Sequence, residues 1–471
     1  MAAGLRWGAP CRSALTVLLA AACALGASVS RDAGAAPGAG AALAAVPAQN
    51  DDHGGGDASA SALVLTPAEI SLALEFSPLP APPPDPTNAV ADDAAAARLG
   101  QALFFDQRLS GPGEISCASC HQPELGWGDG RKLAQGVAQH PRHSMTLWNV
   151  AHNRWFFWDG RKDSLWSQAL APLEDPREHA ASRLQIAHSL ASDRGYARAY
   201  ADVFGALPDL SDSARFPPRG RPVPGDEGHE HARAWASMDA ADQRLVDQVF
   251  VNVGKAIAAF ERRISSDRAP FDVFVEGLRT GDERSLAAIS PSAQRGFALF
   301  AGKARCLLCH DGPLFSDREF HANRVPTGEG VDPGRALGIV RLLEDPFNGS
   351  SEHADDGGLL ARTKLSFPRV GWELPGVFKT PSLRNVAVTA PYMHEGQLAT
   401  LEQVIAFYSS LEGAAPPGMH DEKILQPLHL SAGEQADLLA FLRALTDEQL
   451  PQELTVAPAT PYLPQGSVKR R

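Results

Sequence analysis

Along most of the chain, apolar residues recur three or four positions apart, which is the spacing of amphipathic α-helices. The stretches that follow this pattern are 94–105, 164–205, 246–263, 401–411 and 432–445. Another helix start is indicated at Thr66, because Pro67 and Glu69 follow it in the order that caps a helix. No stretch alternates strongly between apolar and polar residues, as a half-buried β-strand would. We therefore expect a mostly α-helical fold.

Segments between these helices divide the chain. Residues 206–235 and 345–375 are rich in Gly, Pro and Asp and are predicted to be long loops. Residues 264–290 are the expected boundary between two domains, an N-terminal domain at 65–265 and a C-terminal domain at 266–450. Residues 451–471 form a Pro-containing tail.

The N-terminal segment has the features of an export signal. Two arginines precede an apolar run, Ala14–Leu25, and small residues follow it. This predicts a signal peptide at 1–28, because the run is too short and one-sided for a membrane-spanning helix. Residues 29–64 are rich in Ala, Gly and Asp and are predicted to be a disordered linker. We expect a periplasmic protein, with a lipid anchor on Cys23 as the less favoured alternative.

The overall charge limits the class of partner. The 471 residues carry a net charge of −12, spread along the chain. A diffuse acidic balance argues against nucleic acid and suits a basic partner such as a small basic cytochrome.

One pentapeptide pattern, C-x-x-C-H, occurs twice. The first copy contains Cys117, Cys120 and His121, and the second contains Cys306, Cys309 and His310. This pattern is typical of c-type haem attachment, in which two thiols bind one haem and the histidine ligates its iron. The prediction is therefore two covalently bound haem c groups.

Two other interpretations explain the motifs less well. A zinc site with four thiolates accounts for the cysteines but leaves a histidine after each pair unexplained. A thioredoxin-like redox pair would need a βαβ context around each copy. The remaining cysteines, Cys11 and Cys23, lie in the predicted signal peptide, so an exported chain would keep no other thiol.

Each haem motif follows a similar amphipathic helix. The segment Arg98–Phe104 and the segment Arg295–Phe300 share the pattern G-x-A-L-F. This is a weak internal repeat, which favours two related cytochrome units over two unrelated helices.

Several motifs in the same order resemble the bacterial di-haem cytochrome c peroxidase superfamily, including its MauG-type branch. The segments that carry the resemblance are Leu99–Ser110, Ser116–His121, Leu147–Arg161, Gln168–Glu178, Val253–Arg262, Cys306–His310 and Lys379–Gly396. The resemblance implies two cytochrome-like helical domains with one haem each.

It also implies a role for individual residues near the first haem, where peroxide would react. Gln168, Pro172 and Glu178 match distal-pocket residues of the family, and Glu178 is the candidate acid/base. The alternative is an exposed glutamate at a helix start. Trp158 matches the family's tryptophan between the two haems. The match implies an electron relay, and the alternative role is a core aromatic residue.

Two departures from the ordinary peroxidases favour the MauG-type branch. The histidine that blocks the first iron in those enzymes is missing, although the nearby His140 could still reach the iron from an offset loop. Tyr408 stands where they have the methionine ligand of the second haem. Tyr408 shares a helix face with Leu401 and Ile405, so it points inward. Tyrosinate favours oxidised iron, whereas methionine favours reduced iron.

Alternatives for this second ligand are Met393 and Met419. The family's calcium ion is held by backbone oxygens at positions matching Thr389 and Pro391 and by an asparagine. His143 replaces that asparagine here, which leaves calcium in doubt, because this ion prefers oxygen ligands.

The resemblance implies a periplasmic oxidoreductase that reduces hydrogen peroxide. Its electrons would come from a small cytochrome c or from a protein or organic substrate. A homodimer is compatible with the sequence. The alternative function is a di-haem electron carrier without a catalytic step.

Overall fold

The computed structural model describes residues 63–327, 330–416, 424–447, 449 and 451–462. These residues belong to one compact unit, which spans 59–471. They form fifteen α-helices and one small sheet, so the prediction of a mostly helical fold is confirmed. The predicted signal peptide and nearly all of the predicted linker lie outside the described residues. Within the described part, no helix is both long enough and apolar enough to cross a membrane.

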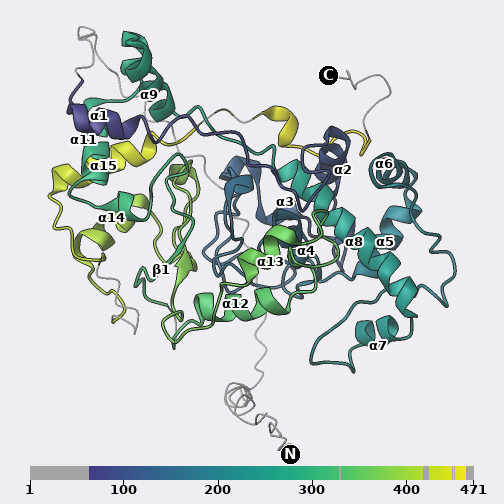
Figure 1. Ribbon diagram of the computed structural model, residues 1–471. Helices are drawn as coiled ribbons and strands as arrows, with labels where there is room; N and C mark the ends of the chain where they lie inside the picture. The colour runs from purple at the N-terminus through teal and green to yellow at the C-terminus, as the bar shows by residue number, and fades with distance from the viewer. Residues whose placement is uncertain (1–62, 328–329, 417–423, 448, 450, 463–471) are drawn as a thin grey trace, which may run out of the picture. The chain divides into compact units, whose positions relative to one another are not determined.

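The helices and strands are labelled in Figure 1. The first half of the chain holds α1 (Pro67–Ala73), α2 (Ala94–Phe104), α3 (Cys117–Cys120), α4 (Leu165–Glu174), α5 (Arg183–Ser192), α6 (Arg194–Phe204), α7 (Glu230–Ala236) and α8 (Ala240–Glu261). The second half holds α9 (Pro270–Thr280), α10 (Glu283–Leu286), α11 (Pro291–Ala301), α12 (Gly334–Glu344), α13 (Leu359–Leu365), α14 (Leu401–Ser410) and α15 (Ala432–Arg443). Strands β1 (Phe320–His321) and β2 (Phe378–Lys379) pair antiparallel.

Side chains before the helices fix where they begin. Thr66 and Glu69 form a capping box at α1, as the sequence predicted. Ser164 accepts a hydrogen bond from the Ser167 N–H at the start of α4. Thr400 accepts one from the Gln403 N–H at the start of α14. These caps satisfy backbone donors that a helix leaves unpaired, and so they hold α4 and α14 at the positions from which both present site residues.

The shared G-x-A-L-F pattern has a structural reason. A Cβ atom on Gly100 of α2 would lie 1.8 Å from the Ala256 carbonyl oxygen of α8. A Cβ atom on Gly296 of α11 would lie 2.0 Å from the Asp437 carbonyl oxygen of α15. Each glycine therefore lets its helix touch the backbone of a second helix, which positions the haem motif that follows.

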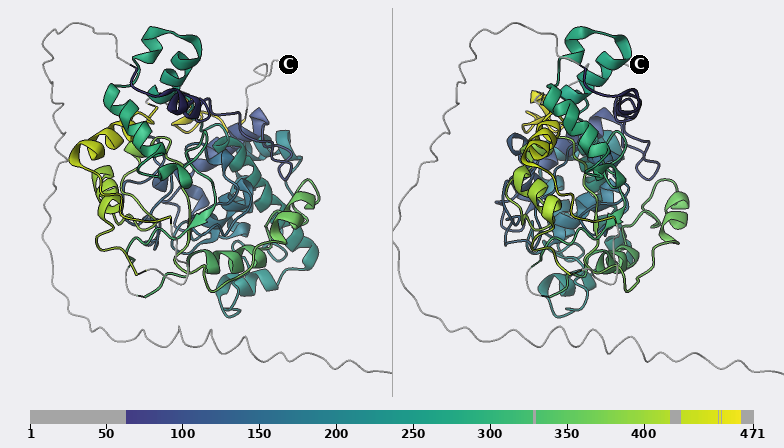
Figure 2. Two further views of the ribbon diagram at one scale, coloured as in Figure 1. Left: turned by 60° about the vertical axis from the view of Figure 1, so that its left-hand side comes forward. Right: turned by 90° about the vertical axis from the view of Figure 1, so that its left-hand side faces the viewer.

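The buried apolar residues form two main clusters. The first joins α2, α4, α5 and α8, and the second joins α9, α11, α14 and α15. Ala73 of α1 belongs to the second cluster, and Figure 2 shows purple α1 beside the teal and yellow helices of that group. Phe347 and Leu454 belong to the first cluster. Apart from residues such as Ala73, Phe347 and Leu454, the two clusters follow the predicted division of the chain near residue 265. The domain boundaries stay a prediction.

Several predicted segments differ from the structure, and the predicted loop at 206–235 ends in helix α7. The predicted loop at 345–375 contains α13, a two-turn helix whose Ala361 and Leu365 are buried. The predicted tail is partly ordered, because Gln101 of α2 donates from its side-chain nitrogen to the Val456 carbonyl at 2.9 Å. Helix α8 begins six residues before the predicted start, because Asp239 caps it.

Candidate functional site

The two C-x-x-C-H motifs lie in short helical turns. Cys117 and Cys120 are the first and last residues of α3, and Cys306 begins a 3₁₀ turn that ends at Leu308. All four cysteines in these motifs are free thiols and are half-buried. Each pair is therefore available to bind a haem.

Both motif histidines are held in the same tautomer. The Nδ1 atom of His121 lies 3.0 Å from the Trp127 carbonyl oxygen, and that of His310 lies 2.8 Å from the Phe315 carbonyl oxygen. A carbonyl only accepts, so Nδ1 carries the proton and Nε2 is left with a free lone pair. Burial lowers the pKa of both imidazoles, which keeps them neutral. This is the state in which histidine binds a metal.

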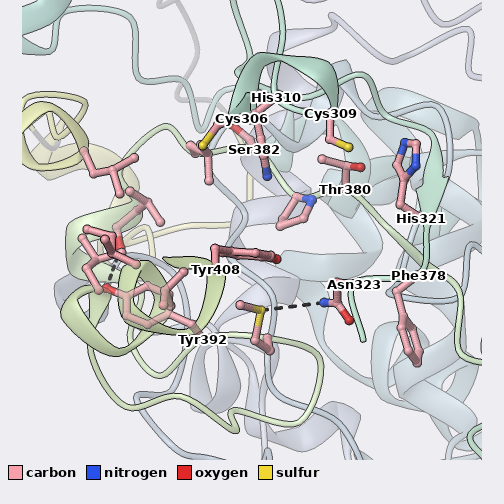
Figure 3. Close-up of a pocket in the computed structure, with 18 of the residues that line it drawn as sticks. Cys306, Cys309, His310, His321, Asn323, Phe378, Thr380, Ser382, Tyr392 and Tyr408 are labelled. Carbon is pink, nitrogen blue, oxygen red and sulfur yellow. Dashed lines mark hydrogen bonds between the residues drawn. The ribbon is translucent and has the colours of Figure 1, made fainter. Parts of the chain in front are cut away.

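A cavity of about 270 Å³ adjoins the second motif. Cys306, Cys309 and His310 line it, and Tyr408 on α14 lines it as well (Figure 3). In Figure 3 the Tyr408 hydroxyl and the His310 ring project into the same space. Leu401 and Ile405, on the same face of α14, also line the cavity. An apolar space between an imidazole and a phenol, with two thiols at its edge, fits a covalently bound haem.

Tyr408 and Met393 both lie at this cavity, but their polar atoms differ. The Tyr408 hydroxyl has no hydrogen-bond partner among the described residues, and burial raises the pKa of its phenol. The Met393 sulfur accepts a hydrogen bond from the Asn323 amide at 3.8 Å. Met419, the other alternative, lies outside the described residues. The free hydroxyl makes Tyr408 the better-placed ligand, and its role stays a prediction.

Helix α4 and the segment after it carry the three predicted distal residues. Gln168 and Pro172 lie on α4, and Glu178 follows four residues after its end. The Gln168 side-chain oxygen is buried without a hydrogen-bond partner among the described residues. A buried acceptor without a partner is costly unless a ligand or water supplies one. The orphaned amide therefore fits a pocket that receives a small polar molecule.

Glu178 lies in an environment that disfavours its charge. Burial raises the pKa of its carboxyl to about 7, while Arg161 opposes the shift. Its Oε1 atom lies 3.8 Å from the Nε2 atom of His140. The charge of Glu178 raises the pKa of both the Cys117 and the Cys120 thiol, so Glu178 lies near the first motif. A carboxyl with a pKa near neutrality can both accept and return a proton.

Trp158 lines the same cavity beside the second motif. Its indole N–H donates to the His143 carbonyl at 3.0 Å, and its ring meets His394 edge-on at 6.5 Å between centroids. The Lys379 N–H of β2 donates to the Trp158 carbonyl at 2.8 Å. Trp158 is thus fixed on both its backbone and its side chain at one wall of that cavity.

The predicted calcium position contains an imidazole. The His143 ring, which is buried, binds the Arg131 carbonyl through Nδ1 at 2.8 Å and has the Thr389 backbone as a second hydrogen-bonding neighbour. Pro391 follows Thr389 by two residues. Calcium prefers a cage of oxygen atoms. The residues at this position do not fit that ion, because an imidazole already contacts the Thr389 backbone.

Sequence reasoning missed one buried acid, whose charge raises the pKa of the Cys117 thiol in the first motif. Glu261, the last residue of α8, is only 4% exposed, and its Oε2 atom has no partner among the described residues. Burial raises its pKa to about 8. In the sequence, apolar residues precede Glu261 and two arginines follow it, a pattern that is typical of a solvent-exposed helix end.

Comparisons with known proteins agree with this site. A family model described as di-haem cytochrome c peroxidase matches residues 94–280. Cytochrome-c peroxidase IdrP1 of Denitromonas iodatirespirans is 37% identical over 357 residues, covering 74% of this chain and 80% of that protein. Methylamine utilization protein MauG of Methylorubrum extorquens is 34% identical over 352 residues, covering 74% and 78%.

Two solved structures are also similar. A MauG-like protein associated with microbial copper homeostasis is 28% identical with a TM-score of 0.55, covering 81% of this chain and 98% of that chain. The di-haem peroxidase BthA of Burkholderia thailandensis is 23% identical with a TM-score of 0.55, covering 78% and 89%, which supports the fold alone.

The chain therefore belongs to the di-haem cytochrome c peroxidase family, which includes the MauG proteins. It is a peroxidase-like oxidoreductase with haem cofactors.

Proposed function

We propose that this enzyme reduces hydrogen peroxide at the first haem site, with electrons from an external donor that pass through the second. The haems are bound covalently, one by Cys117 and Cys120 and the other by Cys306 and Cys309. When bound, the first haem would supply the iron at which peroxide reacts and the electrons that break the O–O bond. The reaction is H2O2 + 2H⁺ + 2e⁻ → 2H2O.

The observation that carries this proposal is the buried Glu178 carboxyl, whose pKa is raised to about 7 and whose charge acts on both thiols of the first motif. Glu178 accepts a proton from one peroxide oxygen and returns it to the other, which then leaves as water. The orphaned Gln168 amide orients the peroxide by a hydrogen bond. Pro172, between them in sequence, lies inside α4 and shapes the end of that helix.

His310 and Tyr408 would hold the second haem, and Trp158 would couple it electronically to the first. Support comes from the free Tyr408 hydroxyl and from Trp158 at the wall of the same cavity. A tyrosine ligand stabilises oxidised iron. We therefore propose that this haem is a weak store of reducing electrons, as in a MauG-type enzyme.

The cellular setting follows from the sequence. We propose an exported protein in the periplasm, because residues 1–28 have the features of a signal peptide. The net charge of −12 suits a small basic cytochrome c as electron donor. A protein or organic substrate oxidised at the surface is the other class of donor.

The test is peroxide turnover by the haem-loaded protein and its Glu178→Gln variant, with an organic reducing dye as electron donor. The wild-type kcat/KM should rise with pH through about 7, because the carboxylate is the form that accepts the proton. The variant should lose this pH dependence and about 10²- to 10⁴-fold in rate. Glu114→Gln, at an exposed position in the same half of the chain, is the control.

An unchanged rate in Glu178→Gln would contradict the assigned mechanism. A wild-type protein that consumed no peroxide with the dye or with reduced cytochrome c would support the second candidate, a di-haem electron carrier. The buried Glu178 carboxyl near the first motif argues against that candidate, because a carrier needs no proton-transfer group beside its iron.

A further inference from the structure

The loop that follows the first haem motif is pinned to the backbone around Glu178. The Val137 N–H donates to the Glu178 carbonyl and the Ala138 N–H donates to the Arg177 carbonyl, each at 2.9 Å. A Cβ atom on Gly136 would lie 2.6 Å from the Arg177 carbonyl oxygen, so this approach requires a glycine. The pinned loop fixes the distance between its own residues and the Glu178 side chain.

His140, at the end of this loop, has a defined tautomer. The Arg142 N–H donates to Nδ1 of His140 at 3.2 Å. Nδ1 is therefore the unprotonated nitrogen of the neutral ring, and Nε2 carries the hydrogen. Nε2 is the atom that faces Glu178, 3.8 Å from Oε1. Both side chains are largely shielded, at 15% and 23% exposure, so one water or a small rotation closes the hydrogen bond.

This tautomer also bears on the first iron. Histidine binds iron through a nitrogen lone pair, and the lone pair of neutral His140 is engaged by the Arg142 N–H. The remaining nitrogen presents a hydrogen to Glu178. The geometry thus directs His140 to the carboxylate and away from iron ligation.

We propose that His140 is a positioning residue for Glu178, orienting its carboxylate through the Nε2 hydrogen and setting the pH at which it accepts a proton. The inference rests on the proposed peroxide reduction and deepens it. Here His140 acts only through Glu178.

The surrounding charges determine how the pair behaves with pH. Burial raises the pKa of Glu178 to about 7 and lowers the pKa of His140, so near neutrality Glu178 is the member of the pair that titrates. Once the hydrogen bond closes, a neutral N–H donor favours the carboxylate and so would lower the pKa of Glu178. The other charged side chains that face the pair are Arg161, Asp175 and Arg177. An Asp175 carboxylate oxygen lies within 4.8 Å of a ring nitrogen of His140 and of a carboxylate oxygen of Glu178.

The test compares His140→Leu, which removes the donor, with His140→Gln, whose amide N–H can replace it. The readout is the midpoint of the pH profile of kcat/KM for hydrogen peroxide in the haem-loaded protein. We expect the midpoint to move up by about one pH unit in His140→Leu. His140→Gln should keep the midpoint within about 0.3 unit of wild type. His229→Gln, a part-buried histidine of the 206–235 segment, is the control and should not move it.

Gly136→Ala is a second way to separate His140 from Glu178, because the added Cβ displaces the loop without replacing the histidine. It should raise the midpoint in the same direction. In a Glu178→Gln background, His140→Leu should change nothing further, as expected for a residue that acts through Glu178.

Two results would overturn the inference. A wild-type midpoint in both His140→Leu and Gly136→Ala, with Glu178→Gln still inactive, would refute it and leave the proposed function intact. Conversion of a low-spin to a high-spin electron paramagnetic resonance (EPR) signal in His140→Leu would show that His140 ligates the iron. If Glu178→Gln kept full activity, the proposed function itself would fail.

Discussion

Glu261 allows a prediction of how stability changes with pH. Its carboxyl is buried at the end of α8 and its pKa is raised to about 8 from an ordinary 4.5. A carboxyl with a raised pKa binds its proton more tightly in the folded state, so stability falls as pH rises from about 4.5 to about 8. At 1.36 kcal/mol for each pH unit, the loss approaches about 5 kcal/mol.

Glu261→Gln keeps the shape of the side chain and removes its charge. We expect the variant to resist this loss and to exceed wild type in stability above pH 8, by up to about 5 kcal/mol. The assay is urea unfolding of the haem-loaded protein at pH 5 and pH 8.5. The difference between the two proteins at each pH cancels the groups that titrate in both. Glu114→Gln, on the surface, is the control. Parallel stability curves for wild type and Glu261→Gln would refute the reasoning.

Three further outcomes are expected. Gly100→Ala should lower the free energy of unfolding by about 3 kcal/mol, because the added Cβ would meet the Ala256 carbonyl. Gly433→Ala is the control and should not destabilise the protein, because a Cβ at Gly433 would meet open space. Thermal unfolding of both variants measures the effect. Calcium chelation with EGTA should leave Tm unchanged, because the His143 imidazole stands at the predicted calcium position, and a lowered Tm would contradict this. Tyr408→Phe should remove or alter one low-spin ferric EPR signal, because it deletes the proposed ligand oxygen of the second haem.

Local patterns predicted much of this fold and site. Helices such as α8 and α14 follow from apolar periodicity that persists for several turns. The haem motifs are contiguous, so their chemistry is visible in the sequence. The inward direction of Tyr408 could be predicted because its helix face is set by Leu401 and Ile405, and all three line the cavity beside the second motif.

Features that depend on distant contacts were not predictable. Helix α13 lies in a Gly- and Asp-rich stretch, and its apolar face is defined only by what it packs against. The pairing of His140 with Glu178 depends on backbone hydrogen bonds between two loops nearly forty residues apart in sequence. Glu261 illustrates the reverse problem, because a single charged residue at a helix end gives no sign that it is buried.

The most direct test of the central claim is a low-temperature EPR spectrum of the haem-loaded, fully oxidised protein. An open first haem and a six-coordinate second haem predict one high-spin ferric signal beside one low-spin signal. That result would support peroxide chemistry at the first haem without prior reduction. Two low-spin signals would mean that a side chain such as His140 caps the first iron, and they would contradict both the proposed mechanism and the role inferred for that histidine.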